Sequence, residues 1–122
     1  MTQYAMLIVG QDVPYDELPE GEIDTTMAEI EAWFEKWSAA GKIVPGGAEL
    51  NDASMAKTVR ATGDGPPMIT DGPYTELKEY IGGVVYLEAD DIDEAAAIAS
   101  EWPRLRPDSG MTAVEVRPII QR

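Results

Sequence analysis

One short segment gathers several side chains capable of acid–base chemistry around a rigid bend. Residues 70–79 read TDGPYTELKE. Gly72 and Pro73 specify a tight turn, because glycine admits left-handed backbone and proline fixes φ. Asp71 lies on the rim of this turn, where a carboxylate can act as a general base or acid. We therefore treat Asp71 as the catalytic candidate, with Tyr74 as a residue that closes a pocket beside it.

Asp71 also has a structural interpretation. Aspartate is favoured in turns because its side chain bonds to nearby backbone amides, and it can cap a following helical turn. The sequence alone favours this structural role. Histidine is absent, which removes the commonest general base and the commonest metal ligand. Cysteine is absent as well, which excludes disulfides, thiolate zinc sites and cysteine nucleophiles.

A second group of candidate residues lies near the end of the chain. Glu115 and Arg117 alternate with valines, so both face the same side of a predicted strand. Either they line a ligand pocket with Tyr86 or Glu88, in which Arg117 orients an anionic group, or they take part in a cross-strand salt bridge. No glycine pair has dinucleotide or Walker spacing, and no loop has EF-hand spacing. We therefore expect no cofactor and no metal.

Composition restricts the class of protein. The 122 residues predict a single domain spanning residues 1–122. The formal net charge of −14 argues against binding to nucleic acid or to an anionic membrane. No apolar run approaches the ~20 residues that span a bilayer, and the first residues lack the pattern of a signal peptide. We expect a cytoplasmic protein that binds neither nucleic acid nor membrane.

Hydrophobic periodicity predicts an α+β fold of the ferredoxin-like βαββαβ type with an inserted hairpin. The prediction is an antiparallel sheet with both helices on one face. A further helical turn is expected over 75–80. The expected strands are 4–9, 42–50 (bulged or at an edge), 84–89 and 113–117, the hairpin arms are 55–61 and 68–70, and the helices are 24–40 and 91–102.

Capping residues are expected at the start of both helices. The first helix has two alternatives, a capping box of Thr26 and Glu29 or an N-cap at Asp24. Asp91 and Glu94 form an N-terminal box for the second helix.

The uncovered face of the predicted sheet carries apolar residues in either register, with Tyr4 or Ala5 and Val84 or Val85 among them. An exposed apolar face of this kind needs a partner. A two-fold homodimer that packs sheet on sheet is the simplest arrangement. Trp33, on the flank of the apolar stripe of the first helix, is expected in the core or in a dimer contact rather than stacked on a ligand.

Four ordered blocks of the chain resemble the YCII-related family, and most closely the branch named for its Asp-Gly-Pro-Phe signature. The blocks are Ile69 to Glu79, Gly82-Gly83, Asp91 to Ala95, and Glu115 to Pro118. Tyr74 stands in place of the signature phenylalanine and keeps the ring. The resemblance spans nearly the whole chain.

The resemblance implies a dimeric α+β barrel of ferredoxin-like protomers. Members of the family have been proposed as enzymes on the basis of a histidine and an aspartate in a cleft. The aspartate corresponds to Asp71, whereas the histidine has no counterpart in this chain, which argues against a His–Asp mechanism. Relatives in this branch are often encoded beside, or fused to, extracytoplasmic-function sigma factors. The resemblance therefore also implies a regulatory or accessory role with a sigma-factor-related partner.

Two functions follow from these observations. The first is a non-catalytic homodimer that binds a small molecule or a protein partner. The second is a small-molecule enzyme of lyase, isomerase or hydrolase type, in which Asp71 is the general acid or base.

Overall fold

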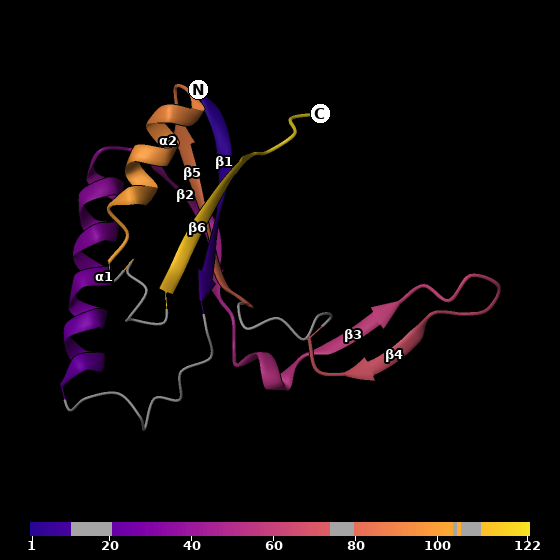
Figure 1. The fold of residues 1–122 in the computed structure, drawn as a ribbon. Helices are drawn as coiled ribbons and strands as arrows, with labels where there is room; N and C mark the ends of the chain where they lie inside the picture. Colours follow the sequence, from indigo (N-terminus) through magenta and orange to yellow (C-terminus); the bar gives the residue numbers. More distant parts are fainter. Residues whose placement is uncertain (11–20, 74–79, 104, 106–110) are drawn as a thin grey trace.

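The computed structural model describes residues 1–10, 21–73, 80–103, 105 and 111–122. Figure 1 shows the elements in their chain order. They are β1 (Thr2–Gly10), α1 (Glu22–Ala39), β2 (Ile43–Glu49), the short 3-10 helix η2 (Ala53–Met55), β3 (Lys57–Arg60), β4 (Met68–Asp71), β5 (Tyr80–Ala89), α2 (Ile92–Ser100) and β6 (Met111–Pro118).

The central sheet has the strand order β2-β5-β1-β6, and every neighbouring pair is antiparallel. Both helices lie on one face of this sheet, and the β3–β4 hairpin projects on the other side (Figure 1). This arrangement confirms the predicted ferredoxin-like α+β fold, with the hairpin inserted between β2 and β5. The helical turn expected over 75–80 falls outside the described residues, except for Tyr80, which begins β5.

The register decides which of the alternating apolar residues face the helices. Tyr4 and Val85 are buried in the core, whereas Ala5 and Val84 are only half-buried. Because side chains alternate along a strand, Ala5 and Val84 lie on the face that the helices do not cover. The sheet therefore has one face packed by helices and one open face with apolar residues.

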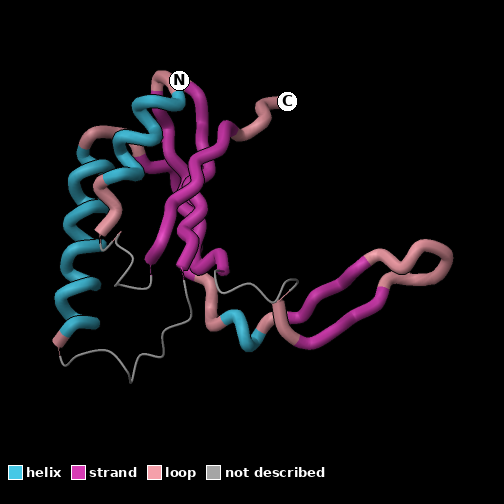
Figure 2. Tube along the Cα trace, in the orientation of Figure 1, coloured by secondary structure: helices cyan, strands magenta, loops and turns pink. Residues whose placement is uncertain are grey.

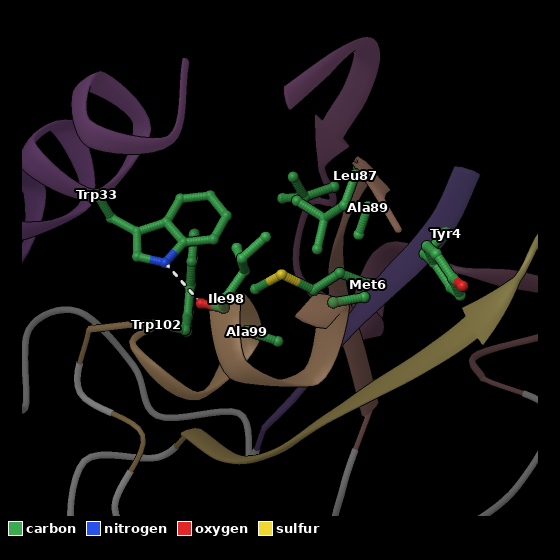
Figure 3. Close-up of a cluster of buried hydrophobic side chains, with 10 residues drawn as sticks. Tyr4, Met6, Trp33, Leu87, Ala89, Ile98, Ala99 and Trp102 are labelled. Carbon is green, nitrogen blue, oxygen red and sulfur yellow. Dashed lines mark hydrogen bonds between the residues drawn. The ribbon is translucent and has the colours of Figure 1, made fainter. Parts of the chain in front are cut away.

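A tryptophan of α1 joins the two helices through the core. The indole Nε1 of Trp33 donates to the carbonyl oxygen of Ile98 in α2 at 3.2 Å (Figure 3). The Trp33 ring also meets the ring of Trp102 edge to face, with centroids 5.0 Å apart. Trp33 is buried, so the structure confirms the prediction that it packs in the core. The buried apolar residues are Tyr4, Met6, Trp33, Val85, Leu87, Ala89, Ala95, Ile98, Ala99 and Trp102.

The predicted caps of α1 are wrong. The N-cap is Gly21, without a side-chain cap, and the hydroxyl of Thr25 donates to its carbonyl oxygen at 3.0 Å. The helix begins two residues earlier than expected, so Asp24, Thr26 and Glu29 all lie inside it. A residue inside the helix is not positioned to cap its first amides.

The predicted cap of α2 is confirmed. Asp91 is the N-cap, and its Oδ1 accepts a hydrogen bond from the Glu94 amide at 2.8 Å. The carboxylate of Glu94 turns back to accept from the Asp90 amide at 3.3 Å. It also accepts from Lys42 Nζ at 2.6 Å, which ties α2 to the residue before β2.

The edge strand β2 is bulged, as predicted, because its pairing with β5 shifts between Val44 and Ala48. Gly47 lies in this bulge and approaches β5 very closely. A Cβ added to Gly47 would stand 2.6 Å from the carbonyl oxygen of Val84, which leaves no room for a side chain. The bulge therefore depends on glycine at position 47.

In the part of the chain that the structure describes, no helix is both long enough and apolar enough to cross a membrane.

Candidate functional site

The arm, defined here as residues 57–71, carries the aspartate that the sequence singled out. Its strands β3 and β4 are antiparallel, with Lys57 opposite Asp71 and Val59 opposite Ile69. This confirms the predicted hairpin. Figure 2 shows that the arm leaves the body as a separate two-stranded ribbon. Asp71 ends β4 and therefore lies at the base of the arm.

The bend after Asp71 is fastened to the base of the arm. Gly72 has φ 92°, in the left-handed region that glycine adopts without the steric penalty of a Cβ. Its amide donates to the carbonyl oxygen of Ala56 at 2.8 Å, and its own carbonyl accepts from the Thr58 hydroxyl at 2.7 Å. Thr58 is buried. These bonds fix the position of Asp71 relative to β3.

The carboxylate of Asp71 forms an ion pair on the surface of the arm. Its Oδ1 accepts from Lys57 Nζ at 2.6 Å, and the two side chains are 89% and 70% exposed. Within the described residues, the carboxylate bonds to this lysine and not to the turn amides that the structural interpretation invoked. Sequence reasoning did not identify Lys57 as the partner.

The open face of the sheet brings together three of the other candidates. Tyr86 on β5 pairs with Ala5 on β1, and Ala5 pairs with Arg117 on β6. Leu7 lies two residues after Ala5 in β1, on the same face, and pairs with Glu115. Neighbouring strands are about 4.8 Å apart, so Tyr86 and Arg117 lie two strand spacings apart on either side of the small Ala5.

Tyr86 is positioned by the bulge of β2. A Cβ added to Gly46 would lie 3.6 Å from both Cδ2 and Cε2 of Tyr86, so the ring rests beside the bare backbone of that glycine. Val44 is the residue of β2 that pairs with Tyr86. The tyrosine is half-buried, which leaves part of its ring accessible on the open face.

Glu115 and Arg117, the charged residues that β6 contributes to the open face, are exposed. The ion pairs that the structure describes include Lys36–Glu101, Lys42–Glu94 and Lys57–Asp71. Glu115 and Arg117 belong to none of these pairs. In the described part of the chain, the predicted cross-strand salt bridge is therefore not formed, and the Arg117 guanidinium is available to another anion.

The Lys42–Glu94 pair is an electrostatic feature that the sequence did not predict. The hydrogen bond from Lys42 holds the pKa of Glu94 below its ordinary value of 4.5. The same bond raises the pKa of Lys42 above 10.5. This pair joins the helix layer to the sheet edge, so it supports the fold and does not contribute to the open face.

The structure separates the site candidates into two places. Tyr86, Glu115 and Arg117 share the open face of the sheet, whereas Asp71 belongs to the arm. Tyr74 lies outside the described residues. Among the described residues, no three carboxylates are grouped closely enough to hold a metal ion. What the open face offers chemically is a cation, a carboxylate and an aromatic ring around an apolar centre.

Comparison with known proteins identifies the family. The model of the YCII-related domain matches residues 3–121. The chain belongs to the YCII-related family. It is also 29% identical over 116 residues to an uncharacterised protein of Rhizobium meliloti (strain 1021), a match that covers 95% of this chain and 90% of that relative. Family membership confirms the resemblance to the YCII-related family, and the name of the Rhizobium relative states no activity.

Proposed function

We propose that this YCII-related protein is a cytoplasmic homodimer that binds a small molecule or a protein partner at the open face of its sheet. The observation that supports the proposal is the composition of this face. Ala5, Leu7 and Val84 form its apolar centre, and Tyr86 and Arg117 stand on either side. An apolar sheet face flanked by a guanidinium and a phenol is typical of a binding surface.

In the proposed dimer, the second copy covers the apolar centre of the open face. Two sheets pack face to face at a separation of about 10 Å, with their inner side chains interdigitated. A two-fold axis through the open face would bring the Leu7 side chains of both copies together. The same axis would place Arg117, on the edge strand β6, at the margin of the interface, where a ligand can still reach it, and Tyr86 farther inside on β5.

The ligand class follows from Arg117 and Tyr86. A guanidinium forms paired hydrogen bonds with carboxylates and phosphates. A half-buried tyrosine ring provides a flat apolar surface and a hydroxyl. A small carboxylic acid with an apolar body matches this pair of groups. A protein partner, including one related to a sigma factor, would offer an acidic side chain to the same arginine.

Catalysis by Asp71 is the alternative function. In that case the protein is a lyase, isomerase or hydrolase type of enzyme, and the carboxylate acts as general acid or base. Such groups work best in sites that exclude water. The Asp71 side chain is 89% exposed and is engaged by Lys57, so the geometry favours binding over catalysis.

A screen of small carboxylic acids tests the binding function. Thermal-shift hits on the wild type are followed by calorimetric titration of wild type, Arg117→Gln and the control Arg122→Gln. Loss of a charge-assisted hydrogen bond is worth ~1.5–3 kcal/mol, so Arg117→Gln should weaken binding about tenfold or more. The Arg122 variant should bind as the wild type does. Equal affinity of all three proteins would show that the ligand does not bind at the open face.

The same compounds test the alternative. They are incubated with wild type and with Asp71→Asn, and product formation is followed by mass spectrometry. Turnover by the wild type that disappears in Asp71→Asn would favour the enzyme. Binding without turnover by either protein would favour the binding function.

A further inference from the structure

The arm carries an exposed aliphatic pair that nothing in the described structure covers. Val59 and Ile69 are directly opposite on β3 and β4, so their side chains lie on the same face of the hairpin. They are 63% and 66% exposed. Met55 and Met68, close by in the chain, are also exposed. An isolated two-stranded hairpin is only marginally stable in water, so an arm of this kind needs a surface to pack on.

The accessible surface of the single chain is large for its mass. The chain exposes 8447 Å², whereas a globular monomer of 13.3 kDa exposes about 6,450 Å². The excess is therefore about 2,000 Å² per chain. Each partner in an obligate dimer buries about 1,000–2,500 Å². An excess of this size falls within that range.

The length and direction of the arm bring it to the second copy. The arm projects from the body on the side of the open sheet face, away from both helices (Figures 1 and 2). Its four-residue strands span about 13 Å without the tip, and two packed sheets are about 10 Å apart. In a dimer that packs open face on open face, an arm of this length crosses the gap and reaches the other protomer.

The charges of the arm face fit a contact between two copies. Each chain has a formal net charge of −14, so a contact between copies is favourable only where it is mainly apolar or locally neutral. Lys57 and Asp71 neutralise each other on the same face as Val59 and Ile69. This face therefore brings an aliphatic surface and no net charge to the interface.

We propose that the arm of each protomer packs against the second copy of this chain, with Val59 and Ile69 as its contact residues. The binding surface around Tyr86 and Arg117 is then bounded by the sheet of one copy and the arm of the other. This inference rests on the proposed homodimer and adds the element that holds it together.

Sedimentation velocity over a range of concentrations tests the contact residues. The test variant combines Val59→Thr with Ile69→Thr, because threonine keeps the β-branch that suits a hairpin. The control is Ile92→Thr, which makes the same change at an exposed isoleucine of α2 on the helix side. The arm variant should raise the dimer dissociation constant about tenfold or more, since anchor residues dominate interface affinity. The control should leave it unchanged.

Hydrogen exchange of the arm amides gives a second, independent readout. The wild type is compared with Leu7→Lys, which places a charge in the centre of the open face and should break the dimer without touching the arm. The paired amides of β3 and β4 should be protected in the wild-type dimer and exchange much faster in Leu7→Lys. Equal protection in both proteins would overturn the inference, because the arm would then be ordered without the partner.

The outcomes separate this inference from the proposed dimer. If the wild type is a monomer at all concentrations, both fail. If Leu7→Lys abolishes a wild-type dimer while the Val59/Ile69 variant dimerises normally, the homodimer stands and the arm contact is wrong. If both variants weaken the dimer and Ile92→Thr does not, both proposals are supported.

Discussion

Lys57 Nζ and Asp71 Oδ1 lie 2.6 Å apart across the base of the arm, on residues directly opposed in β3 and β4. Both side chains are largely exposed, so water screens their attraction. Asp71→Asn should therefore reduce the free energy of unfolding by less than about 1 kcal/mol. Urea denaturation followed by circular dichroism measures the change. A loss of several kcal/mol would show that Asp71 holds the corner together, and the variant could not then serve as a functional probe.

The Lys57–Asp71 ion pair is a feature of the hairpin that the sequence did not predict. The two arms of the hairpin were predicted from their alternating pattern. The register in which they pair was not predictable, because the turn can be centred on more than one residue of Gly63-Asp64-Gly65-Pro66. The observed register centres on Asp64, which places Lys57 opposite Asp71. A shift of one residue in the turn would have given Asp71 a different partner. Its position at the corner was therefore predictable, and its electrostatic partner was not.

The fold was predictable for a different reason. Its strands and helices differ clearly in hydrophobic period, so their order alone indicated the ferredoxin-like topology. The face that each residue of β1 presents was not predictable, because Tyr4 and Ala5 are both apolar. Only packing against the helices decides between them. On β6 the valines alternate with Glu115 and Arg117, so the shared face of these two charged residues could be predicted.

Two tryptophans in one cluster predict different responses to the same substitution. Trp33 donates its indole N–H to the carbonyl oxygen of Ile98, whereas the buried N–H of Trp102 has no partner among the residues that the structure describes. Trp33→Phe loses that hydrogen bond and should cost about 1 kcal/mol more than Trp102→Phe. Urea unfolding of the two variants measures the difference. Equal losses would mean that the Trp33–Ile98 bond contributes nothing net to stability.

The Lys42–Glu94 pair predicts how stability depends on pH. Because the pKa of Glu94 is held below 4.5 in the folded protein, its contribution to stability is fully present above that pH. The contribution is lost as the pH falls through the lowered folded pKa. The pKa of Lys42 is raised, so its dependence on pH runs in the opposite direction. Its contribution to stability is fully present below pH 10.5 and is lost only as the pH rises beyond that value.

The variant Glu94→Gln tests how the pair contributes to stability at acidic pH. The difference in unfolding free energy between wild type and Glu94→Gln should be constant near neutral pH and should shrink below pH 4.5. Glu101→Gln, which breaks the more exposed Lys36–Glu101 pair, is the control and should show a smaller difference. A difference for Glu94→Gln that does not change with pH would show that the carboxylate charge is not what stabilises this contact.

Gly47 predicts a steric effect in the bulge of β2. A Cβ at this position would stand 2.6 Å from the Val84 carbonyl oxygen, and backbone atoms cannot yield as a side chain can. Gly47→Ala should cost about 1–3 kcal/mol, as other overpacking substitutions do. Gly65→Ala is the matched control, because its added Cβ would meet only the Thr62 hydroxyl at 3.5 Å. If the two variants unfold at the same urea concentration, β2 can move away from β5 without a loss of stability.

Salt should strengthen the proposed homodimer. Two chains of formal charge −14 repel each other, whereas the surfaces proposed to meet are apolar or locally neutral. Raising the ionic strength shortens the screening length from roughly 20 Å to a few ångströms, which removes the repulsion and leaves apolar burial almost unchanged. The dimer dissociation constant, measured by sedimentation in low and high sodium chloride, should therefore fall as salt rises. A dissociation constant that rises with salt would mean that ion pairs between the copies hold the dimer, and the aliphatic arm contact would no longer be its main support.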